Sequence, residues 1–512
     1  MIKRLIDKLL GKSAAPRIPL GKRVEVGEAD HGIDASLVDE RAVKVVATLK
    51  KAGHEAYVVG GAVRDLLVGR RPKDFDVATD ATPEQVKQLF RRAFVIGRRF
   101  RLVHVVFGRG RDHEVIEVST FRAYRDASEA DQVSGNERTS KADLAGKTHV
   151  VDAAGRVLRD NVWGPQIEDA ARRDFTVNAM YYDPETRIVV DFHHGLADAK
   201  KRVLRMIGDP VTRYREDPVR VIRAVRFAAK LGFQIENKTK AGMAEAIPLL
   251  GNVPVSRLFD EMIKLLQTGH ALASVEALRT YGLDRSNVFP VLQVIFDQSR
   301  SSEQRHRFIE LALADTDRRV EEGRAVAPSF LLACLLWHDA HTRWEELQRH
   351  GEPPIPALQQ AVDAVFDARI GDVSGRGRLA ADMREIWLMQ PRFERRQANS
   401  ASALVAQPRF RAAYDFLRLR ADAQEVNAEL AEWWEDYSLG DADEREALLQ
   451  VAREAERARR QGEPAAGHGA AAGAGPEASP GTNDAARKRR RRRRRPGGPR
   501  PAGEAAAPVP ET

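Results

Sequence analysis

Two aspartates, two residues apart, carry the clearest chemical signal in this chain of 512 residues. Asp74 and Asp76 lie in DFDVAT, whose alternation predicts a strand over 74–79 with both carboxylates on one face. Carboxylates held this close repel one another unless a cation lies between them. Mg²⁺ suits that place, because it prefers carboxylate oxygens together with substrate phosphates. The pair predicts a metal site for phosphate chemistry, and the plainer interpretation is a surface Asp-x-Asp.

Two glycines upstream of the aspartates predict a phosphate-binding turn. Gly60 and Gly61 join a short buried strand to a helix expected over 61–69. Bare backbone amides can approach a phosphate closely there, and the helix dipole favours an anion. Arg64, one turn into that helix, can reach the same anion. Either motif alone is weak evidence, but their order and spacing favour function over an ordinary glycine turn.

A third carboxylate is expected from a neighbouring strand. Glu117 lies in the middle of EVIEVSTF, whereas Glu114, three positions earlier, faces the opposite side. The alternative is an exposed strand glutamate without a function. Three such carboxylates would hold two metal ions, one activating an attacking hydroxyl and the other stabilising a pyrophosphate leaving group.

Residues 213–233 predict a basic helix. Asp217 and Pro218 are a good N-cap and first-turn proline, so we expect the helix to begin there. One face would then carry a basic stripe: Arg220, Arg223, Arg226 and Lys230. Such a stripe is usually a solvated surface, but the absence of acids within it favours contact with RNA phosphates. Capping alone would explain Asp217.

The net charge of +9 is concentrated in a basic run near the C-terminus, residues 487–495. Nonspecific, salt-dependent RNA binding is the interpretation we favour for this run, over partner docking or solubility. The RNA-binding residues predicted within it are Arg487, Lys488, Arg489, Arg490 and Arg491.

The single cysteine excludes an internal disulfide and a zinc site built from several cysteines. No apolar run approaches the roughly 18–20 residues needed to span a bilayer. The first residues, MIKRLIDKLLGK, lack the cleavage site of a secretory signal. We therefore expect a cytoplasmic protein without a transmembrane segment.

The chain is too long for one compact core. Strand patterns alternate with short helices up to about residue 192, except over 123–160, which we expect to be a loop. Helical periodicity then continues to about residue 458, and low-complexity sequence follows. The predicted fold is α+β: a small mixed-sheet head, a mostly α-helical neck, body and tail, and a disordered basic C-terminus. The expected segments are an irregular leader (1–34), the catalytic head (35–182), the neck with RNA-binding helices (183–275), the helical body and tail (276–458) and the disordered Arg-rich tail (459–512).

These motifs together resemble a known family. GGAVRDLLVG (60–69) followed by DFDVAT resembles the head signature of the class II nucleotidyltransferases, which comprise bacterial poly(A) polymerases and CCA-adding enzymes. RRDFTVNAMYYD (172–183) is similar to their next motif, and residues 213–233 are similar to their nucleotide-recognition motif. The resemblance extends over roughly residues 35–440, where several stretches look like the poly(A) polymerase I versions.

The resemblance implies roles for individual residues. Asp74, Asp76 and Glu117 would ligate the metal ions, and Asp174 would belong to the active site. Asp217 and Arg220 would present an acceptor and a donor fork to adenine. The implied nucleotide-binding residues are Gly60, Gly61, Arg64, Arg173, Asn178, Glu216, Asp217 and Arg220.

The expected function is therefore template-independent addition of AMP from ATP to RNA 3′ ends, with two Mg²⁺ ions or Mn²⁺ in their place. The expected partners are the 3′ ends of mRNA and other transcripts, and RNA-decay proteins. A CCA-adding tRNA nucleotidyltransferase, which would accept CTP and ATP, is the alternative enzyme. A non-catalytic RNA-binding adaptor is the alternative of another class, and the intact carboxylate set argues against it.

Overall fold

The computed structural model describes residues 20–97, 101–108, 113–124, 131–133, 149–152, 157–297, 302–370 and 376–462. The chain divides into two units, Met1–Ala455 and Glu456–Thr512. The elements that form the sheet and the pockets belong to the first unit. The basic run at 487–495 and the predicted disorder of the tail lie outside the described residues. Within the part described, no helix is both long and apolar enough to cross a membrane.

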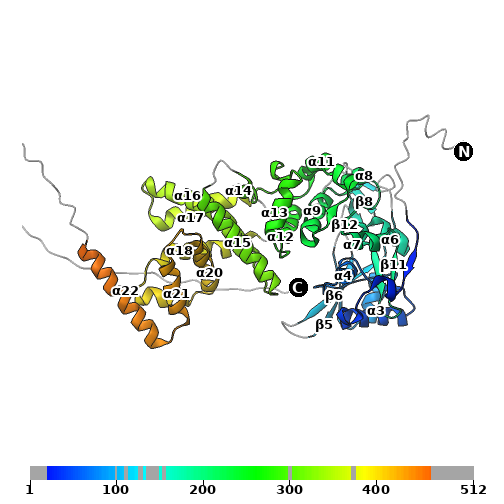
Figure 1. Ribbon diagram of the computed structural model, residues 1–512, viewed down its shortest axis with the longest axis horizontal. Coiled ribbons are helices and arrows are strands. Elements are labelled where there is room, and N and C mark those ends of the chain that lie inside the picture. Colours follow the sequence, from blue (N-terminus) through cyan, green and yellow to red (C-terminus); the bar gives the residue numbers. More distant parts are fainter. Residues whose placement is uncertain are drawn as a thin grey trace, which may run out of the picture. The chain divides into compact units, whose positions relative to one another are not determined.

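The first part of the chain folds around a mixed eight-stranded sheet (Figure 1). Its strand order is β1-β11-β10-β2-β3-β6-β5-β4, and the β3–β6 pair is parallel while the other pairs are antiparallel. The strands are β1 (Val24–Val26), β2 (Ala56–Val59), β3 (Asp76–Thr79), β4 (Ala93–Ile96), β5 (Leu102–Phe107), β6 (Glu114–Thr120), β10 (Met180–Asp183) and β11 (Ile188–Asp191).

Helices accompany this sheet and share its core. Thr82 and Gln85 form a full capping box at the start of α5, where the Thr82 hydroxyl accepts from the backbone N–H of Gln85 and the Gln85 side-chain oxygen accepts from the backbone N–H of Thr82. Apolar residues of α3 and α4 pack in one buried cluster with those of β2, β3 and β6. The helices of this part are α2 (Glu28–His31), η1 (Ala35–Leu37), α3 (Glu40–Lys51), α4 (Gly61–Leu67), α5 (Pro83–Leu89), α6 (Gln166–Arg172), η3 (Thr176–Asn178) and α7 (Gly195–Lys201), the η elements being 3-10 turns.

Two predictions about this part need correction. Residues 123–160 do not lack regular structure, because strands β7 (Asp131–Val133), β8 (His149–Asp152) and β9 (Val157–Asp160) form a separate sheet there. The expected leader also contains β1, which pairs with β11 at the edge of the main sheet. These strands are short and depend on pairing with other strands, which a local pattern does not reveal.

The remainder of the described chain is almost wholly helical, as predicted. One large buried cluster includes residues of η3, α7 and β12 and continues through α8 to α20, and a smaller one joins α18 to α22. A parallel pair, β12 (Val203–Leu204) and β13 (Gln234–Ile235), flanks α8 and α9 in the sequence. The helices are α8 (Pro210–Glu216), α9 (Val219–Leu231), α10 (Asn237–Ala241), α11 (Met243–Ala246), η4 (Ile247–Asn252), α12 (Val255–Leu266), α13 (Ala271–Thr280), η5 (Leu283–Arg285), α14 (Gln293–Phe296), α15 (Glu303–Glu321), α16 (Pro328–Arg349), α17 (Pro354–Arg369), α18 (Arg376–Phe393), α19 (Ala398–Val405), α20 (Phe410–Asp422), α21 (Ala428–Leu439) and α22 (Ala442–Gly462).

Candidate active site

One polar pocket collects most of the residues that the sequence singled out. It has a volume of about 440 Å³ and lies where the β2–α4 turn and the start of β3 meet helices α9 and α12. We call it the arginine pocket. Its lining residues are Gly60, Gly61, Arg64, Asp76, Arg173, Asp174, Asn178, Asp217, Arg220, Arg223, Phe227, Arg257 and Glu261.

The glycine turn forms one wall of the arginine pocket. Gly60 has φ 74° and ψ −129°, a backbone conformation that only glycine adopts without strain. A Cβ added at Gly60 would lie 3.4 Å from Arg173 Nη1. The turn therefore presents bare backbone to the pocket, as a close approach to a phosphate requires.

Arg64 is fixed at the back of the pocket. Its side chain is almost fully buried, and its Nη1 donates to Asn178 Oδ1 at 2.6 Å. The opposite side of the guanidinium pairs with Asp65 Oδ1 at 2.6 Å. Both anchors hold the cation of Arg64 in place before any ligand binds, which lowers the cost of ordering it.

The predicted carboxylates lie on two neighbouring strands in the middle of the sheet, with Asp76 at the start of β3, Asp74 just before it and Glu117 within β6. Phe75 is buried while Asp74 and Asp76 on either side of it are exposed, as the alternation predicted, but the strand begins only at Asp76 and not at Asp74. Asp76 is the register partner of Glu117 across the parallel β3–β6 pair. The surrounding protein and then the negative charges of Glu117 and Asp74 raise the pKa of Asp76 to about 6, against the effect of Arg173. Asp76 is thus close enough to both Glu117 and Asp74 for their charges to repel its own.

A divalent cation would relieve this repulsion, so the donor set fits such an ion by its chemistry. The side chains themselves are not gathered around one point. Among the described residues, no group of three or more His, Cys, Asp or Glu is arranged to hold a metal ion. Glu117 instead lies 3.5 Å from the imidazole of His104, measured from Oε2 to Nε2.

Asp174 links the sheet to α9. Its Oδ2 accepts from Arg223 Nε at 2.9 Å and from Arg223 Nη2 at 2.6 Å. Its Oδ1 accepts from Asn178 Nδ2 and from the backbone N–H of Phe175. Although burial opposes it, this set of donors holds the pKa of Asp174 well below its usual range. Asp174 is therefore a buried anion that fixes Arg223 at the pocket wall.

The recognition motif begins a helix as predicted, but Asp217 does not cap it. Helix α9 starts at Val219, and Asp217 Oδ2 accepts from Arg257 Nη2 at 2.7 Å. Arg220 Nη1 donates to Glu216 Oε2 at 3.1 Å, so Glu216 holds the guanidinium of Arg220 in place. Capping therefore does not explain Asp217, which instead lines the arginine pocket together with Arg220.

The basic stripe of α9 faces acids that come from other elements. Glu261 on α12 lies 3.9 Å from Arg223 and 3.5 Å from Arg226, measured between side-chain N and O atoms. The stripe was predicted to be free of acids because none lies on its own helix face. Tertiary packing supplies them instead, so part of the charge of the stripe is balanced within the protein.

Three lining residues were not predicted: Phe227, Arg257 and Glu261. The Phe227 ring is covered by three guanidinium groups, those of Arg64, Arg223 and Arg226, at 4.5–5.3 Å from its centroid. Cation–π contacts of this kind hold the cations together against their mutual repulsion. Phe227 looked like an ordinary core residue in the sequence. Glu261 did leave a signal, because it is an acid on the buried face of an amphipathic helix.

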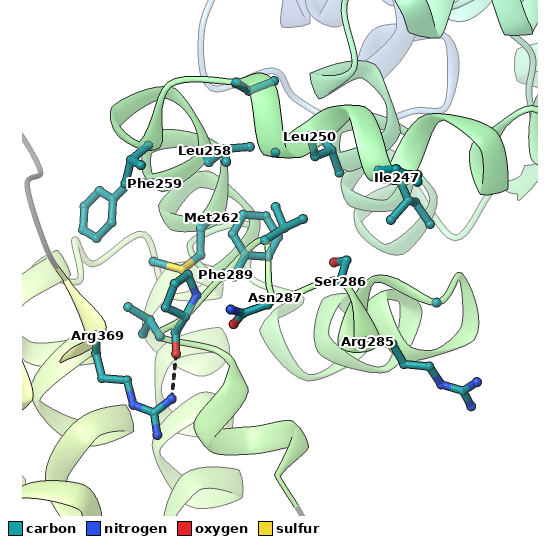
Figure 2. A pocket seen from close by; sticks show the side chains of 18 of the residues that line it. Ile247, Leu250, Leu258, Phe259, Met262, Arg285, Ser286, Asn287, Phe289 and Arg369 are labelled. Carbon is teal, nitrogen blue, oxygen red and sulfur yellow. Dashed lines mark hydrogen bonds between the residues drawn. The ribbon is translucent and has the colours of Figure 1, made fainter.

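A second cavity is apolar and has a volume of about 890 Å³. Most of its lining comes from residues 244–291, with Ala368, Arg369 and Ile370 completing it. Figure 2 shows Phe259, Met262 and Phe289 around it, and Arg369 donating to a backbone carbonyl, that of Pro290 at 3.3 Å. This lining offers hydrophobic contact and no catalytic groups.

Three family models match the chain. Their descriptions are "Poly A polymerase head domain" for residues 56–205, "Probable RNA and SrmB- binding site of polymerase A" for residues 232–295 and "Polymerase A arginine-rich C-terminus" for residues 350–496. The first covers the glycine turn, the three carboxylates and Asp174.

Individual relatives agree with these models. The poly(A) polymerase I of Salmonella typhi is 41% identical over 423 residues, which are 82% of this chain and 86% of that protein. The CCA-adding enzyme of Lactobacillus helveticus is 36% identical over 225 residues, 44% of this chain and 49% of that protein. A solved structure, the CCA-adding enzyme of Bacillus stearothermophilus in complex with CTP, is 22% identical and aligns with 82% of this chain and 98% of that one, with a TM-score of 0.43.

Proposed function

This chain belongs to the bacterial poly(A) polymerase I family of class II nucleotidyltransferases, and we propose that it adds AMP from ATP to RNA 3′ ends without a template. One observation carries the proposal. The glycine turn, the carboxylate of Asp76 and the arginines of the distant helix α9 all line the arginine pocket. Such a combination of phosphate-binding and metal-binding groups suits nucleotidyl transfer.

The triphosphate of ATP is assigned to the wall formed by Gly60, Gly61 and Arg64. The backbone at Gly60 is bare, and the Arg64 guanidinium is already held by Asn178 and Asp65. A fixed cation beside exposed backbone amides suits an anion with several phosphate groups.

The metal site is assigned to Asp74, Asp76 and Glu117, which lie on or just before the neighbouring strands β3 and β6. Two Mg²⁺ ions there would activate the RNA 3′ hydroxyl and neutralise the departing pyrophosphate. The chain's own part is to hold these carboxylates on neighbouring strands so that the hydroxyl and the α-phosphate meet in line. No residue of the chain has to become a covalent nucleophile.

Adenine selection is assigned to Asp217 and Arg220. Both line the pocket, and Glu216 holds the Arg220 guanidinium so that its remaining N–H groups have a fixed direction. A fixed acceptor and donor fork can match the edge of a base. Arg173, Asp174 and Asn178 line the same pocket. Asp174 fixes Arg223 there and accepts a hydrogen bond from Asn178.

RNA and protein partners complete the proposal. We assign RNA contacts to Arg223, Arg226 and Lys230 and to the basic run at 487–495, and we place the activity in cytoplasmic RNA processing and turnover. The segment 232–295, whose family description names an RNA and SrmB-binding site, contains most of the lining of the apolar cavity in Figure 2. We therefore infer that a protein partner of RNA turnover inserts apolar side chains there.

Replacement of Asp76 by asparagine tests the proposal against the adaptor alternative. We expect Asp76→Asn to abolish AMP incorporation into a labelled RNA, because it removes the charge of a metal ligand and changes little else. RNA binding, measured by fluorescence anisotropy, should remain at the wild-type level. Asp80→Asn, an exposed carboxylate just past the other end of β3 that lines neither pocket, is the matched control. Wild-type protein that binds RNA but incorporates no nucleotide would favour the adaptor.

The partial match to the Lactobacillus helveticus enzyme is the observation that supports the CCA-adding alternative. A tRNA that lacks its terminal CCA distinguishes the two enzymes. Our proposal predicts runs of AMP on this tRNA and on unrelated RNA alike. Addition of C, C and A followed by a stop would overturn it and leave the catalytic site assignment intact.

A further inference from the structure

A second charged groove lies next to the arginine pocket, and apart from Arg226 and Lys230 its cations have no assigned ligand. It has a volume of about 720 Å³ and lies between the loop after α4, helix α9 and the C-terminal end of α12. We call it the lysine groove. Six of its lining residues are cationic: Arg70, Arg71, Lys73, Arg226, Lys230 and Lys264.

The positive charge of the lysine groove is only partly balanced. Two carboxylates, Asp65 and Glu321, line it, and Glu261 behind it lies 3.4 Å from Lys264 and 3.5 Å from Arg226. Burial lowers the pKa of Lys230, and neighbouring cations lower it further, against the effect of Asp65. Cations that destabilise one another in this way leave a site that an anion would stabilise.

The position of the lysine groove next to the candidate active site indicates which anion it binds. Lys73 directly precedes the metal-ligand candidate Asp74, and Arg226 lies one helical turn beyond Arg223 on α9. Arg70 Nη1 donates to the backbone carbonyl of Lys230 at 3.2 Å, so the loop after α4 is held against α9. The groove therefore extends along α9 beside the metal-ligand candidates, and Asp65, which pairs with Arg64 of the arginine pocket, also lines it.

An RNA whose 3′ hydroxyl reaches Asp74 and Asp76 must leave the active site along some surface. The lining of the lysine groove includes Lys73, the neighbour of Asp74, and offers six cations in all, which is the chemistry that a string of phosphodiesters requires. Among the described residues, no phenylalanine, tyrosine or tryptophan lines it, so it offers no such stacking platform for a base. We propose that the lysine groove binds the backbone phosphates of the RNA upstream of its 3′ end, without regard to sequence. This inference rests on the proposed function for the direction of the RNA, but its binding test does not require turnover.

The test removes two exposed cations from opposite sides of the groove, in the double variant Arg71→Ala, Lys264→Ala of the full chain. The matched control is Lys51→Ala, Lys87→Ala, which removes two exposed cations from α3 and α5 that line neither site. Binding of labelled oligoadenylates of increasing length is measured by fluorescence anisotropy over a range of salt concentrations. Thermal unfolding checks that both variants fold.

For long oligoadenylates, we expect the groove variant to bind more weakly than wild type and control. Removing one cation that pairs with a phosphate should reduce the slope of log affinity against log salt by about 0.7, hence by about 1.4 for the two together. The shortest oligoadenylates, which do not extend beyond the arginine pocket, should bind all three proteins equally. The Km for ATP should not change.

Wild-type affinity and slope in the groove variant would overturn the proposal, and so would a loss of equal size at every RNA length. Inorganic pyrophosphate serves as the second probe. A variant that loses pyrophosphate binding but keeps long-RNA binding would show that the groove takes free phosphate instead. Failure of wild type to incorporate AMP would refute the proposed function alone, since the anisotropy result stands without catalysis.

Discussion

Replacing Gly60 by alanine tests whether the glycine turn binds the triphosphate of ATP. Gly60 has φ 74° and ψ −129°, so an alanine at this position is strained by about 1–3 kcal/mol. Its Cβ would lie 3.4 Å from Arg173 Nη1 and 3.9 Å from the carbonyl oxygen of Asn178. The methyl group therefore fits without a severe clash, but it covers backbone that we assign to the triphosphate.

Gly69 provides the matched control. It follows the same short helix with φ 72°, and no atom lies within 4 Å of a Cβ built on it. Gly69→Ala therefore strains the backbone without touching the arginine pocket, so the two variants separate strain from loss of ligand contact.

Both variants should lower the free energy of unfolding, measured by thermal or urea unfolding. Only Gly60→Ala should also bind ATP more weakly. The loss of one hydrogen bond from a backbone N–H to a charged phosphate costs about 1.5–3 kcal/mol. That cost corresponds to a rise in the Km for ATP of about 10- to 100-fold. The measurement is the rate of AMP incorporation into a labelled RNA as the ATP concentration varies.

Equal losses of ATP affinity in Gly60→Ala and Gly69→Ala would refute this reasoning, because they would trace the effect to general destabilisation of α4. An unchanged Km for ATP in Gly60→Ala would move the triphosphate away from the glycine turn.

Two further predictions concern side chains that position the pocket. Folding lowers the pKa of Asp174 below the unfolded-state pKa of about 3.9. The charge of Asp174 therefore stabilises the fold fully above that pH, and this stabilisation is lost as the pH falls toward the pKa of the folded state. The difference in Tm between wild type and Asp174→Asn should therefore shrink as the pH is lowered below about 4, and a constant difference would contradict the assignment. Phe227→Leu removes the ring that three guanidinium groups cover, each contact contributing about 0.5–2 kcal/mol. Both Phe227→Leu and Phe233→Leu, a buried core control, should lower Tm, but only Phe227→Leu should also raise the Km for ATP. An equal rise in Km in the two variants would argue against a positioning role.

Short-range patterns predicted the parts of the site that depend on local geometry. Alternation placed Asp74 and Asp76 on either side of buried Phe75, and the same reasoning chose Glu117 over Glu114. The register of β3 against β6 then sets Asp76 opposite Glu117. The placement of Asp76 and Glu117 was predictable because the two-residue period of a strand fixes the direction of each side chain, whereas Asp74 lies just before β3.

Contacts between distant segments were not predictable. The α9 stripe looked free of acids, yet Glu261 reaches it from α12 and Asp174 from the head. Asp217 had the sequence context of an N-cap, but Arg257 takes its carboxylate. Local propensity yields to such tertiary pairing, because leaving a partly buried charge unpaired costs more than a single capping bond contributes.

The central claim is that this chain transfers AMP, and extension of a labelled generic RNA with each nucleoside triphosphate supplied separately tests it most directly. With Mg²⁺ present, we predict a long ladder of products with ATP and none of comparable length with CTP, GTP or UTP. Extension with CTP as readily as with ATP, or extension confined to tRNA ends, would contradict the claim.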